Sequence, residues 1–139
     1  MKIFLCMAFT AASIFASAAA LCTNLSGQWV LYIENPGHGV VATANVEFTD
    51  EIAASCMSGE WKVVKVVSTT TKDKEFFPVS EPLSYRIENG QLTIGRNEVC
   101  DAYLWLQGRL GGTSVHGRYF SLGLGGRSPR GYFKLRQAK

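Results

Sequence analysis

The chain has 139 residues, 47% of them hydrophobic, and a formal net charge of +3. This length suits one domain with a single hydrophobic core. Glycine is abundant, helix-forming residues are sparse, and valine, threonine and aromatic residues are well represented, which favours β structure. No nucleic-acid recognition motif occurs, so we expect no nucleic-acid partner.

The first twenty residues have the pattern of a signal peptide. Lys2 precedes an apolar run over 3–15, and small-x-small cleavage sites end at Ala18 and Ala20. The alternative, a transmembrane helix, requires a longer apolar run of about 20 residues. Cys22 follows Leu21 directly, unlike a lipobox cysteine, so we expect no lipid anchor. The sequence therefore predicts a signal peptide over 1–20 and a soluble domain over 21–139, either secreted or periplasmic, with no transmembrane segment.

The mature chain retains an odd number of cysteines, Cys22, Cys56 and Cys100. An oxidising compartment favours one disulfide and one spare thiol. Cys56–Cys100 is the first choice because both residues lie at strand edges, and a Cys22–Cys100 pair is the alternative. The spacings match no zinc pattern, so we expect neither a metal site nor a cofactor.

Short runs with alternating apolar residues are typical of β-strands. We expect loops or a helical turn over 50–55, a mobile connection over 68–75, and an edge strand or packed loop at 76–79. Asn89-Gly90 is a strong signal for a tight hairpin turn. The predicted strands are 29–33, 40–49, 58–67, 83–88, 91–95, and three more between Asp101 and Lys139.

About eight strands with short hairpin connections predict an all-β protein. No segment is suited to a helical crossover, and an eight-stranded meander closes naturally into an up-and-down antiparallel barrel. A β-sandwich is the alternative.

Positive charge concentrates in the last third of the chain, where Asp101 is the only acidic residue. Arginines and lysines on strands commonly solubilise exposed faces and protect sheet edges. The alternative interpretation is a basic patch for an acidic partner, with Arg118, Arg127 and Arg130 as its contacts.

Both ends of the domain resemble known families. Gly27-Gln28-Trp29 resembles the Gly-x-Trp opening of lipocalins, avidins and related small barrels, and Arg136 is placed like the lipocalin arginine that packs across that tryptophan. That resemblance implies a cation–π contact between Arg136 and Trp29. The segments 25–31 and 133–137 are also similar to the bacterial Inh-type metalloprotease inhibitors, which are exported eight-stranded barrels with one disulfide.

The aromatic residues allow two functions. Trp61, Tyr85, Trp105 and Tyr119 are candidate walls of a pocket for a small hydrophobic or aromatic ligand, although eight strands can also be filled by such a core. No nucleophile, acid–base pair or phosphate loop is evident, so we expect no enzyme. The sequence favours an exported binding module or protein inhibitor, and a hydrophobic-ligand carrier is the alternative.

Overall fold

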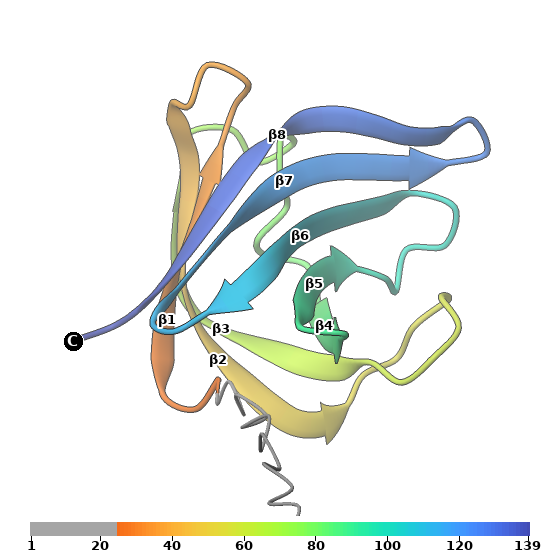
Figure 1. Ribbon diagram of the computed structural model, residues 1–139. Helices are drawn as coiled ribbons and strands as arrows, with labels where there is room; N and C mark the ends of the chain where they lie inside the picture. Colours follow the sequence, from red (N-terminus) through yellow and green to blue (C-terminus); the bar gives the residue numbers. More distant parts are fainter. Residues whose placement is uncertain (1–24) are drawn as a thin grey trace, which may run out of the picture.

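The computed structural model describes residues 25–139, so the predicted signal peptide and Cys22 lie outside the described residues. Eight antiparallel strands pair in sequence order, and β1 pairs with β8, so the sheet closes into a barrel (Figure 1). This confirms the predicted fold. The strands are β1 Gln28–Glu34, β2 Val40–Ile52, β3 Lys62–Thr71, β4 Leu83–Glu88, β5 Gln91–Arg96, β6 Tyr103–Gly111, β7 Ser114–Gly123 and β8 Gly126–Gln137.

Strand alternation explains the core. Successive side chains point to opposite faces of a strand, so Trp29, Leu31 and Ile33 of β1 all enter the barrel. They are at most 1% exposed, and they belong to one cluster that receives side chains from every strand. Burial of this apolar area is the main force that holds the barrel closed.

The predicted hairpin turn between β4 and β5 is present. Asn89 has φ of 51° and Gly90 has φ of 74°, the two consecutive positive values that a type I′ turn requires. Asparagine and glycine adopt this conformation at low cost, which fixes the register of β4 against β5.

Two connections differ from the prediction. β2 continues to Ile52 and β3 to Thr71, so residues 50–52 are strand and not a loop or helical turn, and residues 68–71 are strand and not a mobile connection. β3 begins only at Lys62, so residues 58–61 of the predicted strand 58–67 belong to the connection. The two strands extend together because each provides the hydrogen-bonding partner of the other. Residues 76–79 form a packed loop, and Phe77 is fully buried in the main core.

A second apolar cluster lies outside the barrel wall. Leu104 and Leu106 of β6 enter the main core, so Trp105 between them faces outward, where it packs with Trp61 and Phe120. We call these three residues the outer cluster. The Arg86 guanidinium lies 4.6 Å from the Trp61 ring centroid and adds a cation–π contact.

The Cys56–Cys100 disulfide fastens the β2–β3 connection beside this outer cluster, with the two Cα atoms 5.5 Å apart. The first-choice pairing is thus confirmed. Met57, from the same connection, packs against the outer cluster. Within residues 25–139, no helix is long and apolar enough to cross a membrane.

Candidate functional site: a basic groove over β6, β7 and β8

A groove of about 710 Å³ runs over the outer surface of β6, β7 and β8. Gln107, Arg118 and Tyr132 are paired in register across these three strands and form one row along it. The neighbouring residues Leu106 and Phe133 enter the main core, so this row faces outward.

All three arginines proposed from the sequence as partner contacts line this groove. Arg127 donates a hydrogen bond to Oε1 of Gln107 at 3.1 Å, and its guanidinium lies 4.6 Å from the Phe120 ring centroid. Arg130 is the extra residue of a β-bulge, because Tyr119 pairs with Gly131 while the next residue along β7 pairs with Pro129. Its guanidinium lies 5.8 Å from the Tyr119 ring centroid and 6.0 Å from that of Phe76, two rings of the main core and its margin. Arg118 is exposed.

The groove carries positive charge, and none of its described lining residues is acidic. Its lining includes the three arginines and His116. Within residues 25–139, none of these arginines has an ion-pair partner. The Arg127 guanidinium and the exposed Arg118 carry positive charge on this face, and like charges on a concave surface focus a positive potential that attracts anions.

A buried carboxylate fixes one edge of the groove. Glu34 is 2% exposed, and it accepts hydrogen bonds from Nζ of Lys134 at 2.7 Å and from Nδ1 of His38 at 3.1 Å. The His38 ring stacks on Tyr132, with their centroids 4.3 Å apart. Glu34 thereby holds the β1–β2 turn against a residue that lines the groove.

The protonation of Glu34 follows from these contacts. Burial acts to raise the pKa of the Glu34 carboxyl, but the hydrogen bonds and charges of Lys134 and His38 outweigh burial and hold the pKa below its ordinary value of 4.5. A lowered pKa means that the ionised group stabilises the fold above the ordinary pKa. This contribution is lost as the pH falls through the lowered value.

Replacement of Glu34 by glutamine is expected to lower the free energy of unfolding by about 2 kcal/mol near neutral pH, because a charged hydrogen-bond acceptor is lost. The deficit should shrink as the pH falls from 4.5 through the lowered pKa of Glu34, because the wild-type carboxylate is then neutralised as well. Urea unfolding at about pH 7 and about pH 3 measures both effects. Glu47→Gln is the matched control, since the Glu47–Lys65 pair is solvent-screened. An equal Glu34→Gln deficit at both pH values contradicts this account.

The four residues proposed as walls of a ligand pocket divide between two places. Tyr85 and Tyr119 lie in the main core, whereas Trp61 and Trp105 belong to the outer cluster, so the four do not enclose one cavity. Tyr119 donates a hydrogen bond to the carbonyl oxygen of Phe76, and burial raises its pKa to about 12. The largest interior side chains are almost completely buried against one another.

The residues assigned structural roles by the resemblance are placed as follows. Trp29 is buried in the main core, and its Nε1 donates to the carbonyl oxygen of Leu25 at 3.1 Å. Gly27 has φ of 84°, a conformation that side chains rarely adopt, directly before β1. Arg136 is exposed and pairs with Val30, one residue from Trp29. The implied Arg136–Trp29 stacking is wrong, because the two side chains leave opposite faces of the sheet, and the cation–π contacts in the described chain involve other arginines.

Sequence reasoning missed the neutral half of the groove, Gln107, Phe120 and Tyr132. These residues become neighbours only through the register in which the strands pair. The alternation of apolar and polar residues along a single strand does not specify that register. Among residues 25–139, no three histidine, cysteine or acidic side chains gather in a way that could hold a metal ion.

Comparisons of this chain with protein-family models, with curated proteins and with solved structures found no match.

Proposed function

We propose that this chain is an exported, non-enzymatic binding protein that takes an acidic segment of a partner protein in the basic groove. The main support for this proposal is that Arg118, Arg127 and Arg130 line one groove, and no carboxylate is among its described lining residues. Arginine pairs with carboxylates in a bidentate geometry, so an aspartate- or glutamate-rich segment is the complementary ligand.

The groove also has the apolar surface that a protein ligand requires. Phe120 and Tyr132 line it beside the arginines. Aromatic and arginine side chains are enriched where protein interfaces gain most of their affinity. This combination favours a peptide segment over a small inorganic anion.

The packed interior favours the groove over carriage of a hydrophobic ligand inside the barrel. A ligand inside the barrel would have to displace buried core side chains such as Leu31, Leu106 and Phe133. We further propose that the partner is a protease. This more specific proposal is supported by the similarity of segments 25–31 and 133–137 to the Inh-type inhibitors.

Charge reversal tests the groove. The probe is a fluorescent peptide of alternating glutamate and tyrosine, and its anisotropy is measured as a function of protein and salt concentration. The triple variant Arg118→Glu, Arg127→Glu, Arg130→Glu is expected to weaken binding by about a hundredfold or more, because each arginine contributes a charge-assisted contact.

The matched control is Lys72→Glu, Lys74→Glu, Lys139→Glu, which makes the same change in net charge with residues outside the groove lining. This control should retain most of the affinity at moderate salt, since exposed charges beyond a Debye length are screened. Equal weakening by both triple variants would show that only net charge matters and would refute the groove.

A further inference from the structure

The barrel wall has a gap between β3 and β4. β3 pairs with β4 over only Lys62, Val63 and Val64, whereas its pairing with β2 continues to Thr71. Within residues 25–139, the stretch 65–71 therefore has no strand on the side opposite β2. Unpaired main-chain donors and acceptors along a strand form a template for another strand.

The alternation of the ladder shows which main-chain groups face the gap. The N–H of Lys72 donates to the carbonyl oxygen of Val41 at 2.8 Å, so the residues at alternate positions, Thr70 and Ser68, also direct their N–H and C=O groups toward β2. The main-chain groups of Thr69 and Thr71 consequently point into the gap.

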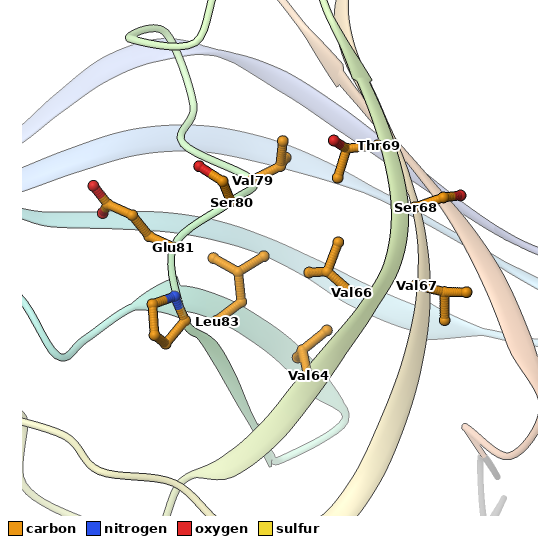
Figure 2. Close-up of a pocket in the computed structure, with 10 residues that line it drawn as sticks. Val64, Val66, Val67, Ser68, Thr69, Val79, Ser80, Glu81 and Leu83 are labelled. Atoms are coloured by element: carbon orange, nitrogen blue, oxygen red, sulfur yellow. The ribbon is translucent and has the colours of Figure 1, made fainter.

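A slot of about 450 Å³ follows this edge. Figure 2 shows Val64 and Val66 extending from β3 toward the facing segment 79–83, while Val67 points away. Val79 and Leu83 from that segment are each 3% exposed and complete an apolar floor.

The far wall of the slot is fixed in place. Phe77 and Val79 anchor it in the main core, and Glu81 accepts a hydrogen bond from Arg96 at 3.0 Å. Pro82, the next residue along this wall, has no N–H to offer. The slot is therefore preformed, and the β3 side offers it a regular hydrogen-bonding edge.

We propose that this slot binds an extended segment of another protein, which adds as a strand to the β3 edge. The free main-chain groups of Thr69 and Thr71 require an extended partner, and the valine and leucine floor requires small apolar side chains at alternate positions. Residues 79–83 lie across the slot from β3. The wall of a second barrel would meet this segment, so the occupant we propose is a single extended segment. This site is separate from the basic groove and does not depend on it.

The test uses a soluble peptide of alternating threonine and valine with a lysine at each end. Two further peptides carry N-methyl groups on alternate backbone nitrogens, one on the odd positions and the other on the even positions. Only one edge of an added strand faces β3, so one methylated peptide should bind about tenfold or more weakly than the other. Equal affinities for both methylated peptides overturn the proposal, and so does a failure of the parent peptide to bind.

Two readouts locate the site. Hydrogen exchange should slow at the Thr69 and Thr71 amides when the peptide binds, while the Ser68 and Thr70 amides are slow in both states. Thr69→Pro removes the N–H that faces the slot and should weaken binding about tenfold or more, whereas Thr70→Ala should leave it unchanged. If Thr69→Pro does not fold, the methylated peptides still decide the question on the intact protein. Protection of the same amides by concentration-dependent dimerisation, without peptide, would assign the edge to a second copy and overturn the proposal.

Discussion

The substitution Gly131→Ala is expected to lower the free energy of unfolding by about 3 kcal/mol, which is in the upper part of the usual range for overpacking. A Cβ atom there would lie 2.1 Å from the carbonyl oxygen of Glu34 on the adjacent strand. Since this neighbour is backbone, it can move only if the β1–β8 pairing moves with it.

The same substitution should also impair the groove. Tyr132 follows Gly131 directly, pairs with Glu34 and stacks on His38, so a displaced β8 disturbs one edge of the lining. Affinity for the acidic probe should therefore fall together with stability.

The matched control is Gly125→Ala, because a Cβ atom at that position meets nothing within 4 Å and the backbone has no left-handed φ. It is expected to change stability by at most about 0.5 kcal/mol. Urea unfolding followed by tryptophan fluorescence compares the two variants. If Gly131→Ala is as stable as the control, the close approach of β8 to β1 is not a feature of the folded protein.

The fold could be predicted from the sequence because its determinants are local. The alternation over Trp29, Leu31 and Ile33 specifies a half-buried strand, and Asn89-Gly90 specifies its own turn. Short hairpin connections then leave few topologies for eight strands. The same strand positions predict the pairing of Cys56 with Cys100, and the structure confirms it.

The surface features depend on interactions between distant segments. Alternation puts Trp105 on the face opposite Leu104 and Leu106, but it does not show that the connection carrying Trp61 covers that face. The bulge at Arg130 and the extension of β3 to Thr71, beyond its pairing with β4, likewise follow from tertiary packing. Charge alone therefore indicates the arginines in the sequence, and no sequence pattern indicates the unpaired edge of β3.

Removal of the disulfide by the double variant Cys56→Ser, Cys100→Ser is expected to lower the free energy of unfolding by about 4 kcal/mol. The two cysteines are 44 residues apart in sequence, and release of a loop of that length increases the conformational entropy of the unfolded chain by about this amount. Replacement of both residues leaves no unpaired thiol from this pair to exchange with Cys22. Urea unfolding measures the change, and wild-type protein in reductant should behave like the variant.

The folded state should also change, and only on one side of the barrel. Without the disulfide, the β2–β3 connection is held beside the outer cluster by weaker contacts, among them the hydrogen bond from the N–H of Cys56 to the carbonyl oxygen of Asn97 at 2.9 Å. Trp61 and Trp105 should then become accessible to iodide quenching, while Trp29 in the main core stays protected.

The outer cluster and the basic groove meet at Phe120, which belongs to both. Trp105 keeps a second anchor, because its Nε1 donates to Oδ1 of Asn97 at 2.8 Å, so the β6–β7 wall itself should persist. The variant should consequently retain its affinity for the acidic probe within about threefold.

Unchanged quenching and unchanged stability would show that the disulfide is not what secures the outer cluster. Loss of probe binding together with the disulfide would show that the cluster and the groove fold as one unit.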